Sequence, residues 1–86
     1  MKDFVIAQEL DARGLQCPMP LVNAHRAIKQ IPVGQVLKVL ATDRGSVLDF
    51  KGWAETDESI ELVKQEEYTD EQGRRVYAHY VRRVEG

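Results

Sequence analysis

One short stretch decides the fold: Leu10-Asp11-Ala12-Arg13-Gly14-Leu15-Gln16-Cys17-Pro18-Met19-Pro20. The segment before it, residues 4–10, is rich in β-forming side chains and predicts a first strand. Asp11 and Gly14 stand where a type I turn favours Asp at its first and Gly at its last position. The two prolines that follow fit the first turn of a helix, where a missing N–H costs the helix nothing. The stretch therefore predicts a strand, a tight turn and the start of a helix.

Apolar side chains recur at helical spacing after Pro18 and predict an amphipathic helix over residues 18–31. At ~100° per residue, five of them fall within about 120° of arc: Leu21, Ala24, Ala27, Ile28 and Ile31. Pro32 and Gly34 then predict the end of this helix.

The next two segments predict a second strand and a second helix. Residues 35–41 are almost continuously apolar and rich in β-formers, as expected of a central strand covered by helices. Ser46 and Asp49 have the spacing of a capping box, which predicts a shorter helix that starts near Asp43 and ends near Gly52 and Trp53. Its apolar face is expected to carry Val47, Phe50 and Ala54.

The last third of the chain predicts a hairpin with opposite charges on its two strands. Residues 59–67 and 74–84 are expected to be strands joined by the turn Asp70-Glu71-Gln72-Gly73. Residues 55–71 hold eight acids and one lysine, whereas residues 74–83 hold four arginines. Opposite charges on neighbouring strands attract each other, so we interpret the pattern as mutual compensation on a solvated hairpin.

Together these elements have the order β-α-β-α-β-β. This order predicts an α+β two-layer sandwich, with a four-stranded mixed sheet and two helices on one of its faces. The 86 residues have room for one small core, so we expect a single domain over residues 1–86.

Composition excludes several classes of protein. One cysteine cannot form an intramolecular disulfide, and with two histidines it does not make a usual zinc set, so no metal or cofactor is predicted. A net charge of −2 argues against direct binding of nucleic acid. No apolar run approaches the ~18 residues of a membrane span, and residues 1–9 lack the apolar core of a signal peptide. We therefore expect a cytoplasmic protein.

Cys17 is the candidate functional residue because of its position. With Cys17 as N-cap, Pro18 and Pro20 occupy the first and third helical positions, and the N–H groups of Met19 and Leu21 stay free. These amides and the helix dipole favour an anion at the cap, so a thiolate or persulfide is expected there, with a lowered thiol pKa. Gly14 shapes the preceding turn, and Arg13 either adds positive charge or is merely solvated. Cysteine is a poor cap, so a nucleophile explains it better than an inert apolar side chain.

The sequence offers this thiol no catalytic partner. His25 lies eight residues along the helix, about 12 Å away at 1.5 Å per residue, and is expected to be partly buried and structural. His79 is assigned no role, and the chain has no second cysteine for a dithiol cycle. A reactive thiol without a base suits a carrier better than a self-sufficient catalyst, so we expect a carrier in a relay rather than a stand-alone turnover enzyme. Met19 and Val22 lie on the polar side of the helix and form either a docking surface or stray surface apolar residues.

The chain resembles the TusA/SirA-like sulfur-carrier proteins, whose signature is Cys-Pro-x-Pro at the start of the first helix. Here the signature is Cys17-Pro18-Met19-Pro20, and the likeness extends over residues 9–54, including Thr42-Asp43-Arg44-Gly45-Ser46-Val47-Leu48-Asp49-Phe50. The resemblance implies that Cys17 accepts sulfane sulfur as a persulfide from a cysteine desulfurase or rhodanese-like donor. It also implies a downstream acceptor protein in tRNA thiolation, cofactor biosynthesis or sulfur oxidation.

Two other functions stay open. The sheet architecture and interleaved basic and aromatic residues of the last strand are compatible with an RNA- or translation-associated binding module: Arg74, Arg75, Tyr77, Tyr80, Arg82 and Arg83. Alternatively, this chain is a regulatory protein in which Cys17 is a redox-sensing thiol.

Overall fold

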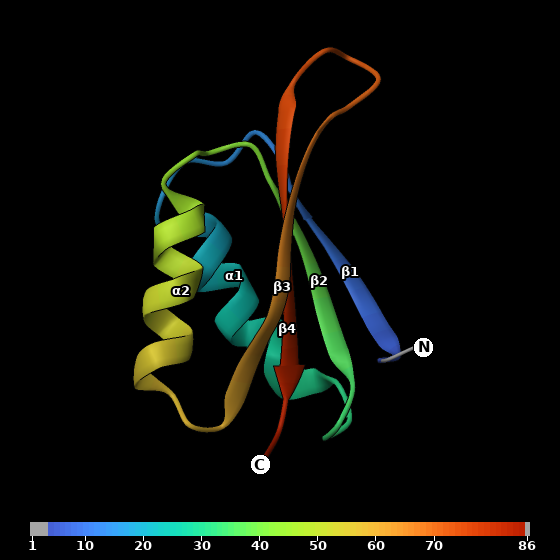
Figure 1. Cartoon of the computed structure of the whole chain (residues 1–86), viewed down its shortest axis with the longest axis vertical. Coiled ribbons are helices and arrows are strands. Elements are labelled where there is room, and N and C mark those ends of the chain that lie inside the picture. The colour runs from blue at the N-terminus through green and yellow to red at the C-terminus, as the bar shows by residue number, and fades with distance from the viewer. Residues whose placement is uncertain (1–3, 86) are drawn as a thin grey trace.

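The computed structural model describes residues 4–85 and places two helices against one face of a four-stranded sheet (Figure 1). The elements follow in the predicted order β-α-β-α-β-β. Their bounds are β1 Ile6–Ala12, α1 Met19–Ala27, β2 Val36–Ala41, α2 Ser46–Thr56, β3 Ile60–Thr69 and β4 Arg75–Arg83, with a short 3-10 turn Ile28–Gln30 after α1. The predicted α+β two-layer architecture is confirmed.

The sheet is mixed, as predicted. Its strand order is β1-β2-β4-β3, with β1 and β2 parallel and the other two pairs antiparallel. A parallel pair needs a crossover between its strands, and α1 provides it. The predicted central strand, β2, is therefore flanked on both sides and almost wholly buried.

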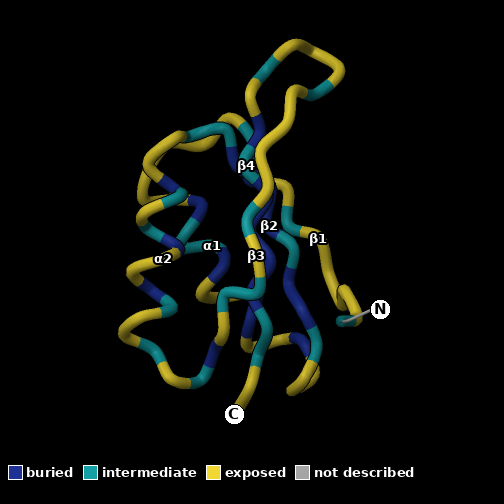
Figure 2. Tube along the Cα trace, viewed as in Figure 1, coloured by how far each residue is buried: buried dark blue, intermediate teal, exposed yellow. Residues whose placement is uncertain are grey.

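The main core lies between the sheet and the helices, where the inner faces of α1 and α2 are buried (Figure 2). The predicted apolar stripe of the first helix forms much of this core, with Ala24, Ala27, Ile28 and Ile31 buried and Leu21 packed at its margin. A smaller cluster on the helix-free face contains Val36, Leu40, Val76, Ala78 and Tyr80. The Lys64 ammonium lies 4.8 Å from the centre of the Tyr80 ring, so a lysine helps to cover that face.

β1 ends later than predicted, and the turn after it has a different form. Asp11 and Ala12 continue the strand because they pair with Leu40 and Ala41 of β2. The turn therefore spans residues 12–15, where the Leu15 N–H donates to the Ala12 carbonyl at 3.3 Å. Gly14 occupies its third position with φ of +85°, which a turn of type II geometry requires and most side chains disfavour.

α2 is longer than predicted and buries a different face. It runs through Gly52 and Trp53 to Thr56, and its buried residues are Ser46, Phe50 and Trp53. Trp53 packs edge-on against Phe50 and stacks on His25 at 4.3 Å between ring centres, so tertiary packing carries the helix past its glycine. The predicted capping box is wrong: Gly45 is the N-cap, and no side chain caps the helix.

The hairpin confirms the predicted charge compensation. Glu61 pairs across the strands with Arg82, and Arg75 forms an ion pair with Glu67. At the turn, the almost fully buried Asp70 carboxylate accepts from the Arg74 side chain at 3.1 Å. Backbone N–H groups of Gln72 and Arg74 donate to the same carboxylate. These interactions lower the pKa of Asp70, chiefly through the Arg74 backbone hydrogen bond.

Candidate functional site

Cys17 lies at the sheet edge where β1 and β2 end. Because these neighbouring strands are parallel, the loops that follow them, residues 13–18 and 42–45, emerge at the same edge (Figure 1). The Gly14 N–H donates to the Thr42 hydroxyl at 2.8 Å and joins the two loops. The first turns of both helices start at this edge, which brings together residues far apart in sequence.

The thiol sits one residue earlier than predicted relative to α1. The N-cap is Pro18, so Met19 and Pro20 are the first two helical residues, and Cys17 precedes the cap. The Met19 N–H donates to the Gln16 carbonyl at 2.8 Å and closes a turn over residues 16–19 that contains a cis peptide bond between Cys17 and Pro18. The predicted pair of free amides aimed at the thiol is therefore wrong, because one of them is already engaged.

Two carboxylates surround the thiol instead. The Cys17 Sγ is exposed and donates to the Asp49 Oδ2 at 2.7 Å, while the Cys17 N–H donates to the Asp43 carboxylate. The hydrogen bond to Asp49 raises the pKa of Cys17 above its ordinary value, and burial and the negative charges of Asp49 and Asp43 add to the rise. A hydrogen bond from the neutral thiol stabilises the protonated form. The predicted lowering of the Cys17 pKa is therefore wrong.

Sequence reasoning missed both acids as site residues. Asp49 was interpreted as part of a capping box, but its side chain turns toward the first loop. Asp43 comes two residues after β2 ends. This position could have indicated a site residue, because the loops that follow adjacent parallel strands lie at the same edge of the sheet. Asp43 also accepts from the Gly45 N–H at 3.0 Å, so it holds the start of α2 and the Cys17 backbone together.

Arg13, Pro18 and Pro20 were also predicted to support the thiol, and the structure places them differently. Arg13 does not face Cys17: its guanidinium donates to Asp11 at 2.9 Å and approaches Asp70 at 3.4 Å. This hydrogen bond with Arg13 lowers the pKa of Asp11 to about 2. Pro18 is exposed as the cap, whereas Pro20 is fully buried beneath it.

The surface of α1 beside the thiol is partly apolar. Met19 is 43% exposed, Val22 is half-buried, and Leu15 on the preceding loop is 37% exposed. Leu21 and Val22 line a shallow hollow of about 320 Å³ with His25 and Arg26. His25 is exposed and stacks on Trp53, so the expectation of a partly buried histidine is wrong.

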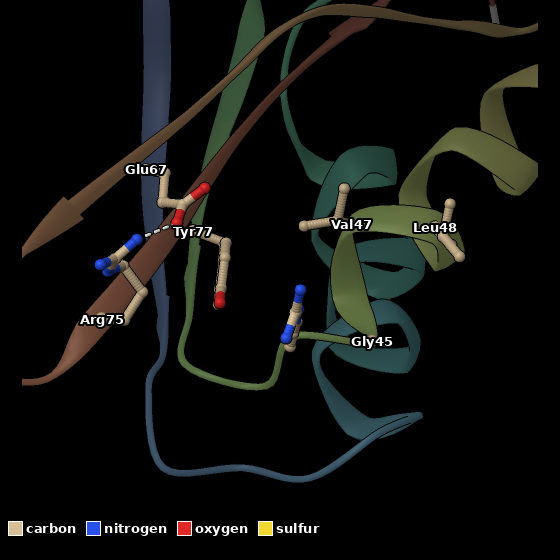
Figure 3. A pocket seen from close by; sticks show the side chains of 7 residues that line it. Gly45, Val47, Leu48, Glu67, Arg75 and Tyr77 are labelled. Atoms are coloured by element: carbon tan, nitrogen blue, oxygen red, sulfur yellow. Dashed lines mark hydrogen bonds and ion pairs between the residues drawn. The ribbon is translucent and has the colours of Figure 1, made fainter.

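The hollow that contains Cys17 is small and open. It measures about 470 Å³ and lies between the two loops, lined by Gly14, Leu15, Gln16, Cys17, Thr42 and Asp43. A larger hollow of about 810 Å³ lies between the start of α2 and the hairpin, and Figure 3 shows Tyr77 and the Glu67–Arg75 ion pair facing it from the strands. Because Cys17 is absent from the lining of the larger hollow, the thiol faces open space and not a deep pocket.

His79, which the sequence left without a role, is fully buried behind the site. Its Nε2 lies 2.8 Å from the Ser46 hydroxyl, and the Gln65 side-chain amide donates to Nδ1 at 3.1 Å. The same amide donates to the Val47 carbonyl, so Nδ1 must accept and Nε2 carries the proton. Burial lowers the pKa of His79 to about 4. This histidine is a neutral core residue.

The described residues contain no group of three or more His, Cys, Asp or Glu side chains that could hold a metal ion. Within residues 4–85, no helix has the length and apolar character needed to cross a membrane.

Comparison with known proteins identifies relatives along most of the chain. The sequence profile of the family named sulfurtransferase TusA matches residues 8–83. The sulfur carrier protein TusA of Allochromatium vinosum is 46% identical over 67 residues, which cover 78% of this chain and 86% of that protein. A protein of Halobacterium salinarum named "Putative sulfur carrier protein" is 46% identical over 82 residues, 95% of each chain. An Archaeoglobus fulgidus protein with the same name is 39% identical over 61 residues, 69% of this chain and 84% of that protein.

Proposed function

This chain belongs to the sulfurtransferase TusA family, and from that membership we propose that it carries sulfane sulfur as a persulfide on Cys17. The donor in this proposal is a cysteine desulfurase or a rhodanese-like protein, and the acceptor is a second protein downstream. Because the relay needs a reduced thiol, we assign it to the cytoplasm.

The exposed position of the Cys17 sulfur is the observation that carries the proposal. The thiol lies in an open hollow at a loop edge, so another protein's cysteine can reach it directly. Among residues 4–85, no histidine contacts it, since His25 stacks on Trp53 and His79 is buried. An enzyme that completes a reaction alone needs a pocket for its substrate, whereas a carrier needs a thiol that two partners can approach in turn.

The transfer consists of two displacements at sulfur. In the first, Cys17 Sγ attacks the terminal sulfur of the donor persulfide, a new S–S bond forms, and the bond to the donor cysteine breaks. The donor cysteine leaves with the electron pair as a thiolate, so the sulfane sulfur moves without net oxidation or reduction. In the second, an acceptor nucleophile attacks the terminal sulfur on Cys17 and releases the Cys17 thiolate.

Exposed apolar side chains beside the thiol support a docking role for this surface. Met19 and the half-buried Val22 lie in the first turn of α1, and Leu15 extends the same surface onto the preceding loop. Apolar side chains beside a reactive group are typical of a surface that partners cover.

The two alternative functions have less support. The hairpin arginines that prompted an RNA-binding module are engaged with acids or with backbone carbonyls: Arg74 with Asp70, Arg75 with Glu67, Arg82 with Glu61, and Arg83 with Lys29 and Ile31. A redox sensor reacts with peroxide as a thiolate without a protein partner that could favour this form, and the raised pKa of Cys17 opposes the thiolate in the free protein.

Intact mass measurement tests the proposal. The protein is incubated with a cysteine desulfurase and free cysteine and then weighed without a reductant. We expect the wild type to gain the mass of one sulfur atom, and Cys17→Ser, the matched control with an oxygen in place of the sulfur, to gain none. No gain of sulfur mass by the wild type, or the same gain in both proteins, would overturn the carrier function.

A further inference from the structure

The Asp49 carboxylate contacts the sulfur that reacts. Sγ and Oδ2 are 2.7 Å apart, and the partners come from different elements, the loop before α1 and the first turn of α2. The second acid, Asp43, binds the backbone N–H of Cys17 and not its sulfur. The charged groups that face Cys17 from the elements packed around it are these two acids, because Arg13 is turned toward Asp11 and Asp70.

The Asp49 carboxylate beside Cys17 disfavours the thiolate that sulfur transfer requires. The nucleophile in sulfur transfer is the thiolate, and the negative charge of a thiolate is repelled by a carboxylate at hydrogen-bond distance. No positively charged side chain in the described residues pairs with Asp49. Within residues 4–85, Asp49 therefore has no cation beside it that would offset its charge when the thiolate forms.

We propose that Asp49 keeps the unloaded carrier in the thiol form, and that the sulfur donor supplies a lysine or arginine side chain that pairs with Asp49 and frees the Cys17 thiolate. The inference rests on the proposed function, since it names a property of the donor's docking surface. It makes the carrier less reactive toward other electrophiles until the correct partner is bound.

The proton and electrons balance in this step. The cation of the donor takes the place of the thiol proton as the partner of Asp49, and Cys17 Sγ attacks the terminal sulfur of the donor persulfide. The S–S bond to the donor cysteine breaks, and the donor thiolate takes up the proton that Cys17 releases. The sum is one thiol and one persulfide before the step and one persulfide and one thiol after it.

The first test measures alkylation of Cys17 by iodoacetamide, which needs no sulfur donor. Asp49→Asn removes the charge and offers an N–H to the thiolate, so we expect alkylation at neutral pH to be about five- to tenfold faster than in the wild type. Asp43→Asn is expected to have a smaller effect, because its carboxylate bonds the backbone. Glu55→Gln, which makes the same charge change on the exposed side of α2 two turns away, serves as the matched control and should not alter the rate.

The second test measures sulfur uptake from two small persulfides of opposite charge. Cysteamine persulfide carries an ammonium group, and 3-mercaptopropionate persulfide carries a carboxylate. We expect the wild type and Glu55→Gln to take sulfur about three- to tenfold faster from the cationic probe, and Asp49→Asn to lose most of this preference. Both probes are compared at the same ionic strength, because salt screens the attraction.

The outcomes separate the two proposals. Unchanged alkylation in Asp49→Asn, or an equal charge preference in Asp49→Asn and the wild type, overturns the role of Asp49 even when sulfur still loads on Cys17. Faster alkylation in Asp49→Asn without sulfur uptake by any variant, from a desulfurase or from either probe, overturns the carrier function while Asp49 still controls the thiol. Circular dichroism of each variant verifies that the fold is retained.

Discussion

The first turn of α2 directs one polar side chain into the core and another to the surface, and the two meet opposite conditions. Ser46 is 2% exposed and faces His79, which is also bonded to Gln65 and stacked on Phe50 at 4.3 Å between ring centres. Asp49, three residues later, faces an exposed thiol beside a second acid. The buried group has every polar atom paired in a neutral network, whereas the half-buried Asp49 adds negative charge beside a nucleophile.

This difference separates what holds the protein together from what it does. A buried polar group that loses its partner destabilises the fold, so the network around His79 is expected to govern stability. The carboxylates of Asp43 and Asp49 are half-buried at the surface and contribute less to stability, so these acids can be arranged for chemistry instead. The following predictions test this separation.

Removal of the buried ring is expected to have the largest effect. His79→Ala leaves a cavity and takes away the partners of Ser46 and Gln65, so the free energy of unfolding should fall by about 3–4 kcal/mol. Urea unfolding followed by circular dichroism measures the loss. If His79→Ala unfolds at the same urea concentration as the wild type, the buried network around His79 does not govern stability.

The neutral state of His79 predicts a loss of stability in mild acid. Its pKa is lowered from 6.5 in the unfolded chain to about 4 in the fold. Between these values the unfolded state binds a proton that the folded state does not, so stability falls as the pH is lowered from about 6.5 to about 4. The total loss is about 3 kcal/mol, at about 1.4 kcal/mol per pH unit.

Urea unfolding at several pH values tests this dependence, with His79→Gln as the matched control. The glutamine can still bond to Ser46 and does not titrate, so the loss in this window should largely disappear. The carboxyl groups with lowered pKa, Asp11 among them at about 2, release their contributions mainly at lower pH. An equal slope in both proteins between pH 6.5 and 4 would show that His79 is not its source.

Ser46→Ala is expected to have an intermediate effect. The substitution leaves the His79 Nε2–H without its hydroxyl partner in a dry environment, which costs about 1–2 kcal/mol. Iodoacetamide should alkylate Cys17 at the wild-type rate, because Ser46 faces away from the thiol. A changed alkylation rate in this variant would mean that the two sides of the turn are coupled.

Asp49→Asn is expected to change stability least. The acid lies in the first turn of a helix, where it interacts favourably with the dipole, so its replacement costs at most about 0.5 kcal/mol. The alkylation rate of Cys17 nevertheless rises. A loss of stability as large as that of Ser46→Ala would make Asp49 a structural residue and remove the contrast between the two sides of α2.

Local patterns explain how much of the fold was predictable. Ala24, Ala27, Ile28 and Ile31 repeat at helical spacing, and the interactions that make such a stripe form a helix lie within four residues. The mixed sheet followed from the element order, because only a few topologies connect such elements without crossing. Predictions that depended on a particular neighbour were less accurate: the end of α2 was predicted near Gly52 and Trp53, but packing of Trp53 on Phe50 and His25 extends the helix to Thr56.

By itself, the sequence determined the order of the elements and the position of one thiol just before the first helix. Only the tertiary structure decided the charge around that thiol, because Asp43 and Asp49 lie 26 and 32 residues further along the chain. They lie close to Cys17 because β1 and β2 are parallel neighbours, so the loops that follow them are at the same edge of the sheet. Secondary structure depends on neighbours in sequence, whereas the pKa of a side chain depends on distances in space, so the pattern that located Cys17 could not predict its protonation state.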